Sequence, residues 1–453
     1  MTGMVTAPVR VDPMVTLTGL AVGASAASVG VVSVSIGPLQ VYQVLAVAGL
    51  ACALVAKGYS RASATKLIPL DVALVMFAVV RLLVEVYNAE SLRHPASIVA
   101  AIQPMFFFAA YMAGRLCVTD IATLRVFLRG IILVSIPVTA LAVAQVAGVP
   151  STTSMLIRLT QSKSVQDRLD RGDLVRATST IGHWTGLGVY LCAILAATMC
   201  LMILDRQEQR RSRGLLAVAI FTAVGLVTTL TFSVIICGVA ILAFSARAAG
   251  VRAKLIGGCI VGGAAGWAVL SQLVSTRLRQ QYGGTSRSLS GSSGLIPETM
   301  MYRFQIWWNE TLPAIAERPV TGWGRAVYQN GGQWPVIPET IRWPYAESQW
   351  LNLMMTGGLL EFLVLGAVVM FTYTALSRGK FAWTLPARVL LVVATIVSFT
   401  VPLFTNAGLP IPLWAICGGL ASLVIVVNAG TGRPSDRRSG LDSRLEQPVG
   451  VGR

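Results

Sequence analysis

The sequence predicts an all-α protein that crosses a membrane many times, and two observations support this fold class. Of the 453 residues, 55% are hydrophobic and only 12% are charged, whereas soluble domains carry about a quarter charged residues. The hydrophobic residues also fall into repeated runs that are long enough to span a bilayer as helices. The chain is therefore expected to be a polytopic membrane protein.

We predict twelve membrane-spanning helices, one for each apolar run of the required length. Only the short stretch Thr231–Ser233 divides residues 214–247 into two spans. Met1–Pro13 lacks a basic segment followed by a short apolar core, so no cleavable signal peptide is expected. The predicted spans are residues 14–35, 38–56, 67–87, 97–117, 126–147, 184–204, 214–230, 231–247, 255–275, 349–375, 386–405 and 409–428. They form one transmembrane domain, residues 1–428, and the polar residues 429–453 are expected to be a disordered cytoplasmic tail.

The positions of Lys and Arg predict that both termini lie in the cytoplasm. With the N-terminus inside, the short loops predicted inside are basic, whereas those predicted outside carry only Arg93. Positive residues favour the inner side of a membrane. This bias explains much of the net charge of +17. The charge therefore indicates the lipid bilayer as a partner and not a nucleic acid.

Two long loops, residues 148–183 and 276–348, are predicted on the outer face. Loops of this length in a compact bundle are usually functional or disordered. Residues 283–294 are rich in Ser and Gly and are expected to be flexible, whereas RFQIWWNETLPAIAE, from Arg303 onward, is helix-like. Six of the ten Trp lie between Met301 and Glu361, and Trp prefers the membrane interface. We therefore expect a site for an amphipathic ligand here.

Three charged residues of these loops indicate glycosyl transfer. Arg176 precedes the span at 184, Arg303 begins the helix-like segment, and Glu347 lies where the second loop returns to the membrane. Arg binds phosphate through paired hydrogen bonds and stabilises the charge of a leaving pyrophosphate. A carboxylate can accept the proton of an attacking sugar hydroxyl. If the two loops fold over one cavity, these groups suit transfer of a sugar from a lipid diphosphate.

A longer pattern connects the second loop with the span that follows it. It consists of R-x-x-x-W at Arg303 and Trp307, P-x-x-G-x-G at Pro319, Gly322 and Gly324, and Glu347-Ser348-x-x-Leu351 leading to Gly358-Leu359-Leu360. This pattern resembles the O-antigen ligase and polymerase superfamily, whose members are integral-membrane glycosyltransferases of the C-type architecture. Arg176 and the segment Pro412-Leu413-Trp414 resemble the family more weakly.

The resemblance implies a polysaccharide polymerase or ligase of the bacterial cytoplasmic (inner) membrane, with its active site on the outer face. The donor would be a glycan on undecaprenyl or a similar polyprenyl diphosphate, and the acceptor a sugar hydroxyl of a glycan or lipid. Transfer would be inverting, without metal or cofactor, and other polysaccharide-assembly membrane proteins are expected partners. The implied catalytic residues are Glu347, Arg303 and Arg176. The predicted substrate-binding residues are Trp307, His183, Trp350, Gly322, Gly324, Arg279 and Arg81.

The chain departs from the family pattern at several positions. Many ligases carry His-Asn where this chain has Glu347-Ser348, and that His is taken as the base. Some polymerase-type members place an acid there, so Glu347 can take the role. The chain also has Thr356 where the family has an acid, Glu361 where it has Gly, and no Arg of the family's Ser-Arg pair within Thr231–Val234. These departures leave polymerase and ligase open and weaken an assignment as a lipid A–core ligase.

Each candidate also has a structural interpretation. Arg176 could pair with an Asp of its own loop, Arg303 could lie over an indole at the interface, and Glu347 could stabilise the start of the next helix. Arg81 and Glu85, four residues apart, could form an ion pair within one span. The alternative function is a membrane transporter or flippase of lipid-linked sugars. Carriers usually show internal repeats, and none is visible in this sequence.

Overall fold

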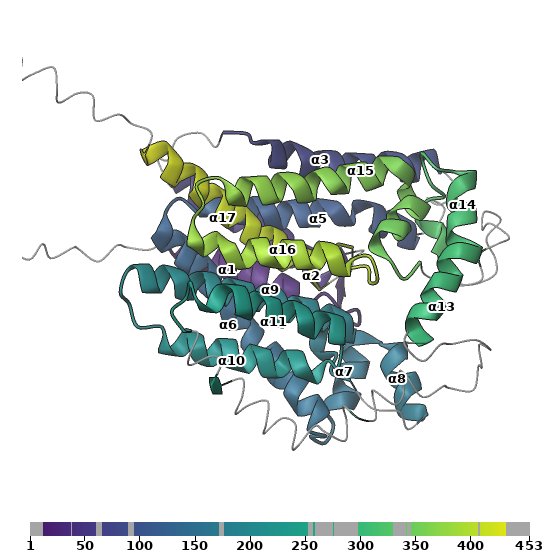
Figure 1. Ribbon diagram of the computed structural model, residues 1–453, viewed down its shortest axis with the longest axis horizontal. Coiled ribbons are helices and arrows are strands. Elements are labelled where there is room, and N and C mark those ends of the chain that lie inside the picture. Colours follow the sequence, from purple (N-terminus) through teal and green to yellow (C-terminus); the bar gives the residue numbers. More distant parts are fainter. Residues whose placement is uncertain are drawn as a thin grey trace, which may run out of the picture.

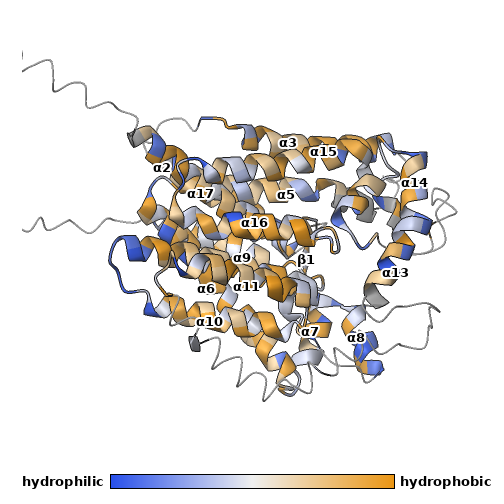
Figure 2. Cartoon of the chain, in the orientation of Figure 1, coloured by the Kyte–Doolittle hydropathy of each residue, from blue (hydrophilic) through white to orange (hydrophobic). Residues whose placement is uncertain are grey.

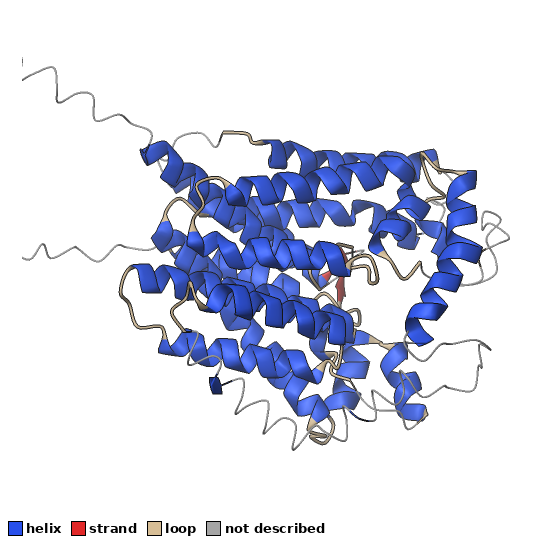
Figure 3. Cartoon of the chain, viewed as in Figure 1, coloured by secondary structure: helices blue, strands red, loops and turns tan. Residues whose placement is uncertain are grey.

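The computed structural model describes residues 12–37, 39–59, 66–88, 95–171, 176–251, 257–258, 275, 298–328, 341, 346–405 and 408–431. This part of the chain is almost entirely helical, with one short antiparallel hairpin (Figure 3). The elements are α1 (Pro13–Ala27), β1 (Ser35–Ile36), β2 (Leu39–Gln40), α2 (Val41–Tyr59), α3 (Pro69–Tyr87), α5 (Pro95–Cys117), α6 (Ile121–Val146), α7 (Thr152–Thr160), α8 (Lys163–Asp170), η1 (Ser179–Ile181), α9 (Trp184–Gln207), α10 (Arg213–Thr228), α11 (Phe232–Ala246), α13 (Glu298–Ile306), the π-helical turn η2 (Trp307–Thr311), α14 (Leu312–Glu317), η3 (Arg325–Tyr328), α15 (Gln349–Ser377), η4 (Ala382–Thr384), α16 (Leu385–Val397) and α17 (Pro410–Thr431). The predicted all-α class is confirmed.

Five helices in the described residues are long and apolar enough to cross a membrane, judged by length and composition: α2, α6, α9, α15 and α17. The helices α1, α10, α11 and α16 are apolar but shorter. The chain is thus an all-α membrane protein, and the number of twelve spans stays a prediction. The predicted span 255–275 lies outside the described residues except for 257, 258 and 275, as do the Ser/Gly-rich segment 283–294 and the tail beyond 431.

The described parts of both long predicted loops lie at one end of the bundle. The helices α7 and α8 come shortly before the start of α9, and Figure 1 shows α13 and α14 at the same end. We call this the loop end. Because α9 has 24 residues, its other terminus lies roughly 36 Å away. The prediction of a loop over residues 148–183 was incomplete, because this segment contains the short helices α7 and α8.

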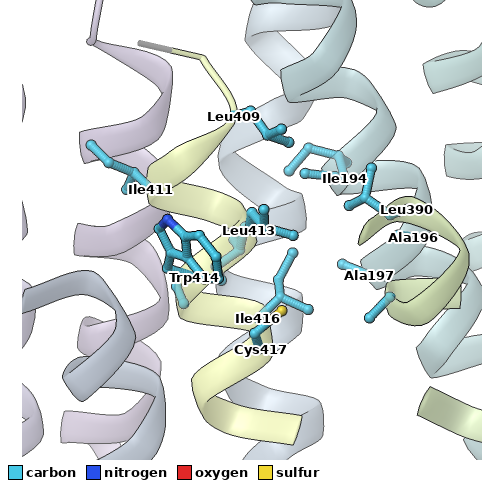
Figure 4. Close-up of a cluster of buried hydrophobic side chains, with 14 of the residues drawn as sticks. Ile194, Ala196, Ala197, Leu390, Leu409, Ile411, Leu413, Trp414, Ile416 and Cys417 are labelled. Atoms are coloured by element: carbon cyan, nitrogen blue, oxygen red, sulfur yellow. The ribbon is translucent and has the colours of Figure 1, made fainter. Parts of the chain in front are cut away.

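The helix α9 forms the centre of the bundle. Every residue of its most apolar window is buried, as expected for a helix that is hydrophobic on all sides. Ile194 of α9, Leu390 of α16 and Leu413 of α17 meet in the core (Figure 4). The small side chains of Ala196 and Ala197 allow neighbouring backbones to approach α9 closely. The surrounding helices are also largely hydrophobic (Figure 2).

The helix α15 is interrupted at Gly358, which has φ 61° and ψ −159° within an otherwise helical segment. The second loop supplies hydrogen-bonding partners to the break: the amides of Trp323 and Gly324 donate to the carbonyls of Met355 and Thr356 at 2.8 and 2.9 Å. In return the amide of Leu359 donates to the carbonyl of Pro319 at 2.8 Å. A broken helix at membrane depth requires such partners, because lipid offers none.

Two predicted spans are longer than the helices observed. The prediction of a span over 14–35 was wrong beyond Ala27, where α1 ends. The hydroxyl of Ser28 donates a hydrogen bond to the carbonyl of Ala24, and the chain then continues into the hairpin of β1 and β2. The prediction of 386–405 was wrong beyond Val397, because Pro402 cannot donate to a helix and disfavours helical backbone before it. Conversely, α6 begins at Ile121, with Asp120 as its N-cap, and not at 126.

Two arginines that the sequence places in short inner loops are buried and paired. Arg115 lies 3.6 Å from Asp71 and donates to the carbonyl of Lys66 at 2.9 Å. Arg125 lies within α6, 2.8 Å from Glu208 and 3.3 Å from Asp205. These two cations therefore pair with acids of other helices.

The break in α15 predicts a large difference between two glycines of the same helix. A Cβ at Gly358 would lie 2.2 Å from the carbonyl oxygen of Val320, whereas Gly366 has no atom within 4 Å of that position. Because only Gly readily adopts this backbone conformation, Gly358→Ala should cost at least about 1–3 kcal/mol. Gly366→Ala should be neutral or stabilising, since Ala favours helix. Thermal unfolding midpoints in detergent check this, and equal midpoints would contradict the described break.

Candidate active site

Arg303 and Glu347, 44 residues apart in sequence, form an ion pair at the loop end. The Nη2 atom of Arg303 lies 3.1 Å from Oε2 of Glu347, and the two side chains are 24% and 31% exposed. Arg303 lies in the last turn of α13, and Glu347 directly precedes the N-cap of α15. Solvent or a ligand can therefore reach both charges. Two of the three predicted catalytic residues are in direct contact.

The backbone of Glu347 is in the left-handed region, with φ 53°. A non-glycine residue in this region is uncommon and costs of order 1–3 kcal/mol, and such conformations often occur at functional sites. The neighbouring peptide is held by Trp307, whose indole donates to the carbonyl of Ala346 at 2.6 Å. The π-helical turn that starts at Trp307 is also a feature enriched at functional sites.

The turn before α15 is anchored on the connection between α16 and α17. The amide of Gln349 donates to the carbonyl of Ser398 at 2.8 Å, and its Oε1 accepts from the amide and hydroxyl of Thr405 at 3.1 and 3.0 Å. The indole of Trp350 packs against Phe399 and Phe404 among other aromatic rings. Trp350, predicted to bind substrate, therefore contacts protein in this structure and supports the turn that carries Glu347.

Arg176 precedes η1, and its side chain lies against the turn between α10 and α11. Its Nε donates to the carbonyl of Thr229 at 3.0 Å and its Nη2 to the hydroxyl of Thr231 at 2.5 Å. The guanidinium carbon lies 4.4 Å from the ring centre of Trp184, and the side chain is buried. Arg176 thus reaches the segment Thr231–Val234, which contains no Arg of its own.

The connection between α16 and α17 contacts both the start of α9 and the turn before α15. A Cβ at Gly408 would lie 2.2 Å from the carbonyl oxygen of Gly186, two residues after Trp184. The same connection between α16 and α17 carries Thr405, which holds the turn before α15. Gly408 thus lies against the helix whose Trp184 stacks on Arg176, and Thr405 against the turn that carries Glu347. Arg279 lies outside the described residues.

Gly322 and Gly324 have backbone roles. Their φ angles are 62° and 77°, and a Cβ at Gly322 would lie 2.7 Å from the amide nitrogens of Gly357 and Gly358. The P-x-x-G-x-G motif thus fits against the break in α15, and its glycines act through backbone contact with the protein.

Arg81 is buried and forms an ion pair with Glu361 of α15. Glu361 also accepts a hydrogen bond from the hydroxyl of Thr356 at 3.2 Å. Glu85 accepts from the backbone amide of Arg325 at 3.0 Å. The sequence interpretation missed Glu361 as a partner, although it is the only charged residue of its apolar run, and such residues are functional candidates by default.

No protein-family model matches the sequence, and no curated protein matches it. The family resemblance therefore stays a prediction.

His183 predicts a specific pH dependence of stability. Its Nδ1 accepts from the amide of Thr185 at 3.2 Å and caps α9, and burial together with the charge of Arg176 lowers its pKa to about 4. In the unfolded chain the pKa of His183 is about 6.5. The folded state therefore has its full stability above pH 6.5, where His183 is neutral in both states, and loses stability as the pH falls towards 4. His183→Asn keeps a capping acceptor and removes this titration. Its unfolding midpoint should fall less than that of the wild type between pH 7 and 4.5, and parallel curves would contradict the assignment.

The buried pair predicts that two substitutions together cost less than either alone. Arg81→Met or Glu361→Met leaves one uncompensated buried charge and should cost about 3–5 kcal/mol. The double variant leaves none and should be more stable than both single variants. Unfolding midpoints of the three variants in the same detergent test this. Additive losses would show that the two side chains do not depend on each other.

Proposed function

We propose that this chain is a glycosyltransferase that moves a glycan from a polyprenyl-diphosphate donor to a sugar hydroxyl on the outer face of the bacterial cytoplasmic membrane. The observation that carries the proposal is the contact between Arg303 and Glu347 at the loop end. It joins a phosphate-binding group to a proton acceptor, and both side chains are partly exposed. The acceptor can belong to a growing glycan or to another lipid, so polymerisation and ligation both remain within the proposal.

In this reaction Glu347 accepts the proton of the acceptor hydroxyl as its oxygen attacks the anomeric carbon of the donor. The bond between that carbon and the diphosphate oxygen breaks, and the electron pair leaves with the lipid diphosphate. Arg303 stabilises the charge that develops there. An Arg side chain stays protonated in proteins, so Glu347 is the member of the pair that can act as the base. A single displacement of this kind inverts the anomeric configuration.

Arg176 would contribute a second cation for the diphosphate. The hydrogen bonds that its guanidinium donates to the carbonyl of Thr229 and the hydroxyl of Thr231 hold it in a fixed orientation over Trp184. A prearranged cation stabilises developing charge without reorganisation.

The test uses the purified full-length chain in lipid vesicles with a polyprenyl-diphosphate glycan, and release of free lipid diphosphate is measured. Glu347→Gln should lower the turnover about 10²–10⁴-fold, the range typical of a general base. Arg303→Lys should be nearly as harmful as Arg303→Ala, because Lys cannot form the bidentate contact. Glu317→Gln, an exposed acid of α14, is the matched control and should keep full turnover.

The alternative, a carrier of lipid-linked sugars, is favoured by the fully buried Arg81–Glu361 pair, since buried charges within spans often line transport pathways. The same vesicles separate the two functions: an enzyme releases lipid diphosphate, whereas a carrier moves the intact donor across the bilayer. Unchanged release by Glu347→Gln, with the protein folded as judged by its unfolding midpoint, would refute the proposed chemistry.

A further inference from the structure

The helices α13 and α14, joined by the π-helical turn, form one helical arm over residues 298–317 that runs across the loop end (Figure 1). Phe304, Trp308 and Leu312 are 46%, 76% and 41% exposed. They are four residues apart and therefore lie on one side of a helix. The arm thus presents a row of large apolar side chains away from the protein, which we call the apolar stripe.

The opposite side of the arm packs against the protein. Ile306, Thr311 and Ala314 are buried, and Ala314 and Ile315 pack in a small core with Val327 and Met355. The contrast is sharpest between neighbours: Trp307 donates to the carbonyl of Ala346, whereas Trp308 is the most exposed Trp among the described residues. Phe304 touches Trp307 of the same arm edge-on, with 5.4 Å between the ring centres, whereas Trp308 remains mostly exposed.

The stripe leads to the apolar outside of a predicted span. After α14 the chain passes through Val320, which is 53% exposed and whose carbonyl accepts from the amide of Leu360 at 3.3 Å. Leu360 and Leu363 of α15 are 43% and 55% exposed, on a helix long and apolar enough to cross a membrane. The exposed apolar surface of α15 is thus continued by Val320 towards the arm.

We propose that this arm is an interfacial helix whose apolar stripe lies in the acyl-chain boundary of the outer leaflet. A helix with one apolar and one polar side lies in the plane of a membrane surface, and Trp is enriched at this depth. Arg318, exposed at the end of the arm and stacked 4.1 Å over Trp323, lies beside it as a cation for lipid phosphate. Continuity with the outside of α15 favours lipid over a soluble protein partner.

Seating the arm in lipid would also set the position of Arg303, which directly precedes Phe304 and lies on the same helix. A polyprenyl diphosphate carries its phosphates at the membrane surface, because its acyl-like chain remains in the hydrocarbon. The lipid surface would thus hold Arg303 at the depth of those phosphates. This role rests on the proposed function, whereas the seating of the arm does not.

The seating is tested with spin labels on the full-length chain in vesicles of zwitterionic and anionic phospholipid. A label is placed on Trp308→Cys or on Asn309→Cys, the neighbouring exposed polar residue, in a background in which Cys52 and Cys259 are replaced by Ser. The ratio of collisions with oxygen, which dissolves in lipid, to those with a water-soluble nickel complex should be several-fold higher at 308 than at 309. Equal ratios, or a label at 308 that neither reagent reaches because protein covers it, would overturn the proposal.

Three further variants test the functional role of the stripe. Trp308→Leu keeps an apolar side chain and should keep the turnover, whereas Trp308→Asp should lose most of it without a change in the unfolding midpoint measured in detergent. Asn309→Asp adds the same charge on the polar side and should have no effect. If Trp308→Asp keeps full turnover, the positioning role is refuted even when Glu347→Gln is inactive. If the wild type shows no turnover, the collision ratios still decide the seating.

Discussion

The structure depends on how the broken backbone of α15 is satisfied. A helix interrupted in an apolar environment exposes amide and carbonyl groups, and each unpaired group costs several kcal/mol in lipid. Here the segment from Pro319 to Gly324 provides the missing partners through its own backbone. The same contacts fasten the second loop to a membrane helix. The arm that carries Arg303 is thereby attached to α15 at its C-terminal end, although it lies outside the bundle.

The charged residues of the loop end fall into two classes. Arg81 and Glu361 are fully buried and neutralise each other. Their contribution is to hold α3 against α15 three residues after the break at Gly358. Arg303 and Glu347 are partly exposed, on segments held by backbone contacts rather than by the ion pair itself. An exposed pair contributes little to stability, typically about 0–1 kcal/mol. The strain of the Glu347 backbone is therefore not explained by the stability that this ion pair provides.

Much of the fold could be predicted from the sequence, because apolar runs of sufficient length have few alternatives to a membrane helix. The residue pattern also placed Arg303 and Glu347 in one candidate site, although it did not predict their direct ion pair. The C-terminal ends of α1 and α16 were not predicted correctly. The residues that follow Ala27, and those around Pro402, are apolar enough for a helix to be predicted there from composition. The partner of Arg81 was missed for a different reason: Glu361 lies 280 residues away in sequence, and only the packing of α3 on α15 brings them together. Local spacing suggested Glu85, which accepts a hydrogen bond from the backbone amide of Arg325.

The two arginines proposed for the diphosphate differ in burial and in their partners, and this difference suits the proposed reaction. Arg176 is buried, and its hydrogen bonds to Thr229 and Thr231 fix its orientation. Arg303 is held by one carboxylate that a diphosphate can replace as its partner, because phosphate offers the same paired acceptors. If Arg303 turns towards an arriving diphosphate, Glu347 loses its counter-ion at the moment when a sugar hydroxyl needs a base. The resting ion pair would then keep the base occupied until the donor is bound, which couples donor binding to activation of the acceptor.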